Sequence, residues 1–205
     1  MEESTVPNEP REHKTHPRDG DLPHGKSEQA GSYHNFKAVD RGDGAVKILV
    51  IGRKLNGKGE FARALSKHIP NSVSIGTSAY LVHRLALIHG LTEEDILADK
   101  EHYRPELIDL GNKMCDVDPG CLSSLCLWYA HGAPVIVDGV RRQCEFDRVK
   151  DWFDMIIWVE RPDVEEGFDN FDLQPEWADI IIYNVGSLID LDRKAKVIAQ
   201  GVTTC

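Results

Sequence analysis

The sequence predicts an α/β fold with three layers, in which helices cover both faces of a parallel β-sheet. Short apolar runs rich in β-branched residues alternate along the chain with longer segments of helical periodicity. Such runs are typical of strands that are buried on both faces, as strands of parallel sheets are. Polar residues and glycines follow several of these runs, and ligands of such sheets bind beyond the carboxyl ends of the strands.

Each element follows from its own pattern and its own end signals. In the first helix Phe61 and Leu65 share one side, and Pro70 ends the segment. Gly90 ends the second helix, and Thr92 with the acids after it opens the third. Strands are expected at residues 46–51, 72–75, 134–138, 155–159 and 178–183. Helices are expected at residues 58–68, 78–89, 105–114, 121–131, 145–152 and 188–199, besides the one that Thr92 opens.

Residues 1–45 differ from the rest of the chain in composition. They are rich in Glu, His, Pro, Gly and Ser and contain almost no apolar clusters. Such a segment buries too little apolar surface to offset the entropy of ordering it. The sequence therefore predicts a disordered N-terminal arm at residues 1–45 and one folded domain at residues 46–205.

Charge and cysteine content narrow the class of protein. The net charge is -10, and residues 46–205 contain 25 acidic and 18 basic side chains. This balance argues against extensive contact with a nucleic-acid backbone. The sequence has no secretory signal and no apolar run near the roughly 18 residues of a membrane span. The five cysteines form no Cys-x2-Cys pair, which indicates reduced thiols and a cytoplasmic protein.

The segment between the first predicted strand and helix has the spacing of a phosphate-binding loop. Gly52 is followed after four residues by Gly57 and then Lys58, as in the rule G-x4-G-K-[ST]. Glycines let backbone N–H groups approach phosphate oxygens, and the helix N-terminus adds positive potential. The next residue is Gly59 instead of Ser or Thr, so the loop lacks the hydroxyl that usually binds magnesium.

The loop therefore predicts a nucleotide site for ATP. Lys58 is expected to contact the β- and γ-phosphates and to act in catalysis. Glu60 either binds Mg²⁺ or favours the helix N-terminus as a first-turn carboxylate, and both readings stay open. The residues expected to bind ATP from this loop are Gly52, Arg53, Leu55, Asn56, Gly57, Lys58, Gly59 and Glu60.

Further charged residues predict a second part of the site, in addition to the phosphate-binding loop. Asp138 ends an apolar strand, where a carboxylate can bind magnesium or act in catalysis. Arg141 and Arg142 follow and could bind a phosphate through two hydrogen bonds, although a turn with surface arginines is the alternative. Two cations and an aromatic side chain that lie close together could bind a phosphate and stack on a base, unless they form a solvated helix face. They are Lys100, Tyr103 and Arg104.

Taken in order, these segments resemble a known family. The chain shows Gly-x4-Gly-Lys, then Tyr103-Arg104-Pro105, then Asp138-x2-Arg141 with Glu145, then Glu160-Arg161-Pro162, then Ala178-Asp179 leading to Asn184. This order resembles the deoxynucleoside monophosphate kinases of T-even bacteriophages, within the nucleoside monophosphate kinase-like P-loop superfamily. The resemblance covers residues 46–200 and depends on the order of the segments and their placement at strand ends.

The resemblance implies a kinase that uses ATP and Mg²⁺ and takes a deoxynucleotide as acceptor. It places Asn184 beside the adenine of ATP, and Asp138 and Arg141 at the transferring group. Asp138 and Glu60 are then the candidate metal ligands. The residues expected to bind the acceptor are Lys100, Tyr103, Arg104, Arg142 and Glu145. A homodimer is compatible with this expectation.

The identity of the acceptor stays open between alternatives. Some related phage kinases phosphorylate the 5-hydroxymethyl group of hydroxymethyluracil within DNA, and this chain is similar to what is expected of them. The altered loop at Gly59 and the short connection before Tyr103 favour that acceptor, which implies a phage protein acting in the host cytoplasm. The alternatives are a kinase of free deoxynucleoside monophosphates and a degenerate P-loop module that binds nucleotide without turnover.

Overall fold

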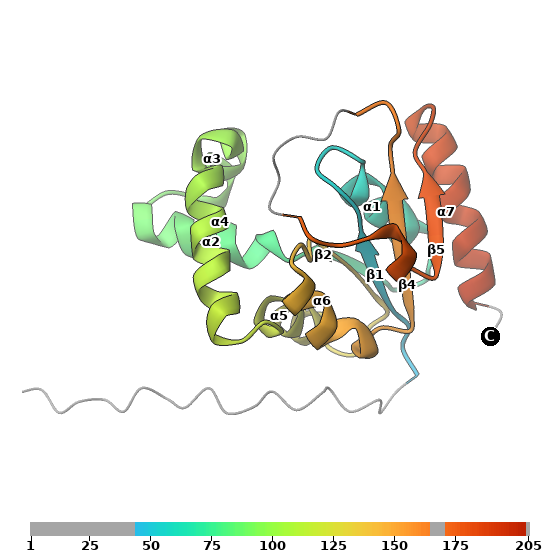
Figure 1. Ribbon diagram of the computed structural model, residues 1–205, viewed down its shortest axis with the longest axis horizontal. Helices are drawn as coiled ribbons and strands as arrows, with labels where there is room; N and C mark the ends of the chain where they lie inside the picture. Colours follow the sequence, from blue (N-terminus) through green and yellow to red (C-terminus); the bar gives the residue numbers. More distant parts are fainter. Residues whose placement is uncertain (1–43, 165–170, 204–205) are drawn as a thin grey trace, which may run out of the picture. The chain divides into compact units, whose positions relative to one another are not determined.

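A five-stranded, entirely parallel β-sheet forms the centre of the domain (Figure 1). The computed structural model describes residues 44–164 and 171–203. The strand order is β2-β3-β1-β4-β5, so β1 lies in the middle. The strands are β1 (Lys47–Ile51), β2 (Val73–Gly76), β3 (Val135–Asp138), β4 (Met155–Glu160) and β5 (Ile180–Tyr183). The sheet confirms the predicted α/β fold class.

Helices cover both faces of this sheet and extend beyond one edge of it. The helices are α1 (Lys58–His68), α2 (Ser78–His89), α3 (Glu93–Ala98), α4 (Lys100–Val117), α5 (Cys121–Tyr129), α6 (Gln143–Val149) and α7 (Leu188–Thr203). Short 3-10 helices follow α6 and precede β5, at η1 (Lys150–Trp152) and η2 (Pro175–Trp177). None of the helices in the described ranges is long and apolar enough to cross a membrane.

The two faces of the sheet form separate apolar clusters. Ile48 and Val50 of β1 pack with α1 and α7 on one face. Leu49 and Ile51 point to the other face, where they meet α5 and α6. All four side chains are fully buried, because successive residues of a strand alternate between the two faces. The uninterrupted apolar sequence of β1 is therefore a consequence of its central position.

A third apolar cluster joins α2, α3, α4 and α5 beside the sheet (Figure 1). Leu85 of α2, Ile96 of α3 and Leu107 of α4 are buried in it. Thr92 caps α3 as predicted, since its hydroxyl accepts from the N–H of Asp95 and the Asp95 carboxylate accepts in return. These helices place α4 where it can face the end of the sheet.

The predicted elements all form, but several boundaries differ. The prediction that the fourth helix begins at Pro105 was wrong, because α4 begins at Lys100 and Pro105 lies inside it. Proline forfeits one N–H bond and usually stands in the first turn of a helix. Here Tyr103 packs against the third cluster from the turn before the proline, and that contact stabilises the earlier start. The arm predicted at residues 1–45 lies, except for Gly44 and Ala45, outside the described residues, as does Cys205.

Candidate functional site

The carboxyl ends of all five strands meet at one edge of the sheet, because every pair of neighbouring strands is parallel. The loop of residues 52–57 leaves β1 there, and the loop of residues 139–142 leaves β3 beside it. Backbone N–H groups and polar side chains therefore gather at this edge. The first helix after β1 begins at Lys58, which directs its N-terminus towards the same edge.

Glycines give the β1–α1 loop its shape. Gly57 caps α1 in the left-handed region, with φ of 89°. A Cβ atom on Gly52, whose φ is 142°, would lie 2.3 Å from the carbonyl oxygen of Val159. Both positions thus require glycine, as a phosphate-binding loop does. Gly59 differs, because its backbone is helical and a Cβ atom there would meet nothing closer than 4.0 Å.

Two asparagines fasten this loop to the neighbouring strands. Asn56 is 3 % exposed, and its side-chain N–H donates to the carbonyl oxygen of Val159 at 3.2 Å. The Asn184 side chain donates to the carbonyl oxygen of Asn56 at 2.9 Å, and the Asn184 backbone N–H donates to Glu160 O at 2.6 Å. Both side-chain amides therefore hold the loop in position from β4 and β5. Buried hydrogen bonds of this kind are costly to break.

Lys58 points back onto its own loop. Its ammonium group donates to the carbonyl oxygen of Arg53 at 2.6 Å. This hydrogen bond keeps the ammonium group of Lys58 beside the loop of residues 52–57. Leu55 sits at the exposed turn of the loop, with φ of 65° and 67 % of its surface exposed.

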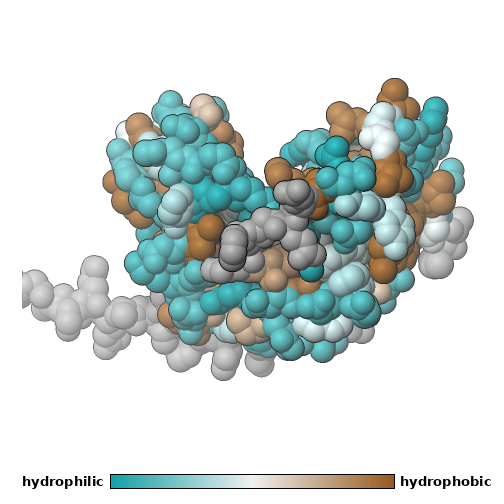
Figure 2. Space-filling view, turned by 45° about the horizontal axis from the view of Figure 1, so that its top comes forward, coloured by the Kyte–Doolittle hydropathy of each residue, from teal (hydrophilic) through white to brown (hydrophobic). Residues whose placement is uncertain are grey.

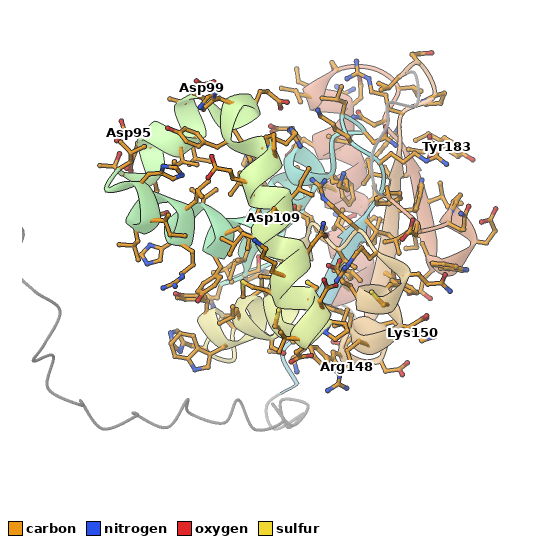
Figure 3. The ribbon with its side chains drawn as sticks, turned by 60° about the vertical axis from the view of Figure 1, so that its left-hand side comes forward. Asp95, Asp99, Asp109, Arg148, Lys150 and Tyr183 are labelled. Atoms are coloured by element: carbon orange, nitrogen blue, oxygen red, sulfur yellow. The ribbon has the colours of Figure 1, made fainter. Side chains whose placement is uncertain are left out.

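A cleft of about 270 Å³ lies between this loop, the ends of β2 and β3, and the helices α2 and α4. Figure 2 shows the surface hollowed between the α2–α4 part and the rest of the domain. Figure 3 shows the course of α4 across the front of the domain, from Asp99 at its start past Asp109. The predicted residues that line the cleft are Leu55, Lys58, Lys100, Arg104, Arg141, Arg142 and Glu145.

The cations of this cleft come from different elements. Burial lowers the pKa of Lys100, and the neighbouring Arg104 and Arg141 lower it further, while Asp138 acts in the opposite direction. Arg104 donates to Glu101 from Nε at 2.8 Å and from Nη2 at 2.5 Å. That pair lowers the pKa of Glu101 to about 2. The clustering of like charges in a partly buried cleft favours an anionic ligand.

Arg142 is held at the cleft by an ion pair, while part of its guanidinium group makes no hydrogen bond. Its Nη1 donates to Asp116 Oδ1 at 2.8 Å, a hydrogen bond that raises the pKa of Arg142. Its Nε and Nη2 atoms are buried and make no hydrogen bond within the described structure, although Nε lies 3.5 Å from Glu145 Oε1. Glu145 also accepts from the backbone N–H groups of Arg141 and Arg142, at 3.0 and 3.3 Å. Glu145 thus positions this turn at the start of α6.

Asp138 ends β3 in a buried setting. Burial raises the pKa of its carboxyl group, while Lys58, Arg63 and Lys100 act to lower it. The net shift is upward, so removal of the carboxylate from water outweighs the attraction of the cations. Perturbed carboxyl groups of this kind are frequent at functional sites.

Other predicted residues lie away from the cleft lining. Tyr103 packs edge-on against His89 and His102, with ring centroids 5.5 and 4.8 Å apart, inside the helical cluster. Glu60 is exposed and forms an ion pair with Arg63. Within residues 44–164 and 171–203, no three acidic, histidine or cysteine side chains gather into a metal site. A magnesium ion that arrives with a nucleotide needs only one or two protein carboxylates, so Asp138 fits such an ion.

The cleft also contains residues that the sequence patterns did not indicate. They are Lys54, Thr77, Ser78, Leu81, Leu107, Ile108, Gly111, Asn112, Leu122 and Gly139. Helical periodicity predicts which side chains of a helix are buried, but it does not predict which other elements those side chains contact. The apolar residues of this set therefore had no predicted role beyond helix packing. Gly111 brings α4 close to α2, since a Cβ atom there would lie 3.1 Å from Leu81 Cδ1.

Comparison with known proteins gives similarity at the level of structure only. No family model matches the sequence, and no curated protein matches it. The crystal structure of a shikimate kinase from Aquifex aeolicus vf5 is similar with a TM-score of 0.40 and 12% identity, over 78% of this chain and 98% of that one. A sugar kinase from Janibacter sp. HTCC2649 has a TM-score of 0.39 and 14% identity, over 77% and 98%. TM-scores below 0.5 are too low to carry a functional assignment, which must come from this chain's own residues.

The two glycines that flank Lys58 should respond differently to a methyl group. Gly57→Ala places a Cβ atom in the left-handed region and 2.4 Å from the Asn184 amide. We expect it to lower the free energy of unfolding by about 1–3 kcal/mol and to weaken nucleotide binding. Gly59→Ala is the matched control, for which we expect stability to be unchanged or higher by up to about 1 kcal/mol. Urea unfolding and titration with an ATP analogue measure both; equal effects would contradict the described loop.

Asp138→Asn should stabilise the protein in a pH-dependent way. The pKa of Asp138 is raised on folding, so the folded state binds its proton more tightly than the unfolded chain and loses stability as the pH rises through that range. We therefore expect the variant to unfold at a higher urea concentration than the wild type at about pH 7, and the gain to vanish near pH 3. Asp109→Asn, which breaks an exposed pair with Lys113, should change little at either pH. A destabilised Asp138→Asn variant at pH 7 would contradict the dominance of burial.

Proposed function

We propose that this chain is an ATP-dependent kinase that transfers the γ-phosphoryl group to a deoxynucleotide-type acceptor. One observation carries the proposal: Lys58 of the phosphate-binding loop shares a single cleft with Lys100, Arg104 and Arg141. A loop for donor phosphates and a set of cations for a second anion are the two halves that phosphoryl transfer requires. Positioning and charge neutralisation supply most of the catalysis in such enzymes.

The donor half consists of the β1–α1 loop and the N-terminus of α1. The loop's N–H groups bind the phosphates of ATP, and Lys58 moves from the Arg53 carbonyl to the β- and γ-phosphates. Asn56 and Asn184 keep the loop in place during this exchange, because their amides bond to the backbone. Mg²⁺ supplies charge neutralisation when it is bound with ATP, and Asp138 is the protein residue proposed to hold it.

The acceptor half consists of α4 and the turn after β3. Arg142 offers buried Nε and Nη2 atoms with no hydrogen bond of their own, which suits an acceptor phosphate. Leu81, Leu107 and Leu122 provide an apolar wall for a nucleobase. A cleft of about 270 Å³ has room for a single nucleotide unit, so an acceptor base in duplex DNA would have to be flipped out of the stack.

Two sources of the acceptor are proposed, each on its own observation. The sequence resemblance favours the 5-hydroxymethyl group of hydroxymethyluracil in phage DNA. In that reaction the hydroxymethyl oxygen bonds to the γ-phosphorus, ADP leaves, and the hydroxyl proton is released to water. The net charge of -10 and the anion-binding atoms of Arg142 instead favour a free deoxynucleoside monophosphate, whose phosphate oxygen attacks without needing a base.

Parallel transfer assays distinguish these acceptors. The full-length protein is incubated with γ-labelled ATP and either hydroxymethyluracil-containing DNA, unmodified DNA or each deoxynucleoside monophosphate. We expect label on one acceptor class, and we expect Lys58→Ala to reduce the transfer at least about 100-fold. Lys67→Ala, an exposed change in the same helix, is the matched control and should retain full transfer.

Other outcomes of the same assay contradict parts of the proposal. Label on free nucleotides alone excludes the DNA acceptor, and label on hydroxymethylated DNA alone excludes the free nucleotide. Binding of ATP that depends on Lys58 without any transfer would indicate a nucleotide-binding module without turnover. Unchanged transfer by Lys58→Ala would overturn the assignment of the loop.

A further inference from the structure

Asn112 of α4 places an amide group in the apolar part of the cleft. It is half-buried and lines the cleft together with Leu81, Leu107 and Leu122, which are 7, 6 and 8 % exposed. Among the described residues that line the cleft, Asn112 is the only one with a side-chain amide. Because apolar side chains satisfy no polar group of a ligand, the amide is a preferred partner for any polar group that enters this part.

The Asn112 amide is not used to hold the fold together. The side-chain amides of Asn56 and Asn184, by contrast, donate to backbone carbonyl oxygens. No hydrogen bond joins the Asn112 side chain to another residue within the ranges 44–164 and 171–203. Asparagine is also a poorer helix former than Leu or Ala, so neither packing nor helix propensity accounts for this residue in the middle of α4.

The side of α4 that faces the cleft changes character along the helix. Lys100, Arg104, Ile108 and Asn112 are spaced four residues apart, and all four line the cleft. Residues at this spacing lie on one face of a helix. Arg104 and Asn112 are two turns apart, about 12 Å along the helix axis. A single ligand would therefore meet the cations and the amide with different parts, one charged and one uncharged.

Gly111 brings this part of α4 close to α2. A Cβ atom on Gly111 would lie 3.1 Å from Leu81 Cδ1, closer than side chains normally pack. The two helices thus approach each other beside Asn112. A flat ring fits next to such a close contact better than a bulky group does.

A side-chain amide is suited to recognise a flat ring with a polar edge. Its N–H group donates while its oxygen accepts, so it matches a nucleobase edge on which a donor stands beside an acceptor. We propose that Asn112 recognises the base of the acceptor through this pair of hydrogen bonds, while Leu81, Leu107 and Leu122 contact the ring. The proposal rests on the proposed kinase function and assigns a specificity-determining residue to it. The same recognition serves a free nucleotide and a nucleotide flipped out of a DNA strand.

Ligands that lack a base test this proposal by binding alone. The full-length protein, saturated with a non-hydrolysable ATP analogue and Mg²⁺, is titrated in a calorimeter with each deoxynucleoside monophosphate, that of 5-hydroxymethyluracil included, and with 2-deoxyribose 5-phosphate. A short single strand of DNA that contains hydroxymethyluracil, with an abasic strand as its base-free reference, distinguishes DNA from the free nucleotide. We expect the wild type to bind at least one base-containing ligand at least about tenfold more tightly than its base-free reference.

Variants at position 112 and beside it locate the effect. Asn112→Leu suits the helix but forms no hydrogen bond, so we expect the affinity for the preferred base to fall at least about tenfold and that for the base-free reference to stay unchanged. Asn112→Asp keeps the shape of the side chain and removes the N–H donor, so the ratio of the two affinities should fall as well. Lys113→Ala is the matched control, because Lys113 is exposed and pairs with Asp109; it should keep the wild-type ratio.

The outcomes separate this proposal from the function on which it rests. An unchanged ratio in Asn112→Leu, or an equal loss for base-containing and base-free ligands, would overturn the role of Asn112 in base recognition. A wild type that binds the ATP analogue but does not distinguish base-containing ligands from their base-free references would do the same. A wild type that does not bind the ATP analogue would instead overturn the proposed function.

Discussion

The shape of the β1–α1 loop is the constraint on which the rest of the site depends. Its N–H groups can face a phosphate only if Gly52 and Gly57 adopt backbone angles that other residues avoid. The Asn56 and Asn184 amides then tie that shape to β4 and β5. The parallel sheet brings the ends of β1, β3, β4 and β5 to one edge, so a loop after the central strand is anchored from the strands beside it.

The cleft and the end of β3 beside it contain groups that oppose folding and suit ligand binding. The buried Asp138 carboxyl, the like charges around Lys100 and the two buried Arg142 nitrogens without a hydrogen bond are each unfavourable in a domain without ligand. Such features concentrate at functional sites, where ligand groups compensate for them. The surrounding scaffold is well packed, since the central strand is buried on both faces and α4 is packed against α2 and α5.

The sequence predicted the fold and the glycine-dependent shape of the β1–α1 loop more completely than the side of the cleft that α4 forms. Uninterrupted apolar runs identify buried strands, and Gly52, Gly57 and Lys58 form a local pattern, so both were readable from the chain alone. Thr77 carries no such pattern, because a threonine after a strand gains meaning only when the fold brings it to the same cleft as Lys58. The Arg142–Asp116 pair and the anchoring role of Asn184 likewise join residues far apart in sequence. The helix that contains Pro105 was expected to begin there, since the contact of Tyr103 with its neighbours is a tertiary effect.

The central claim is that the β1–α1 loop and α4 form two halves of one site for phosphoryl transfer. Hydrogen exchange with a bisubstrate analogue, in which adenosine and a deoxynucleoside are joined by five phosphates, tests it most directly. The account predicts that the analogue slows exchange of backbone amides both at residues 52–59 and along α4 and residues 139–142. It also predicts that an ATP analogue alone protects the loop without protecting α4 to the same degree. Protection confined to the loop with the bisubstrate analogue would contradict the claim that α4 binds the acceptor.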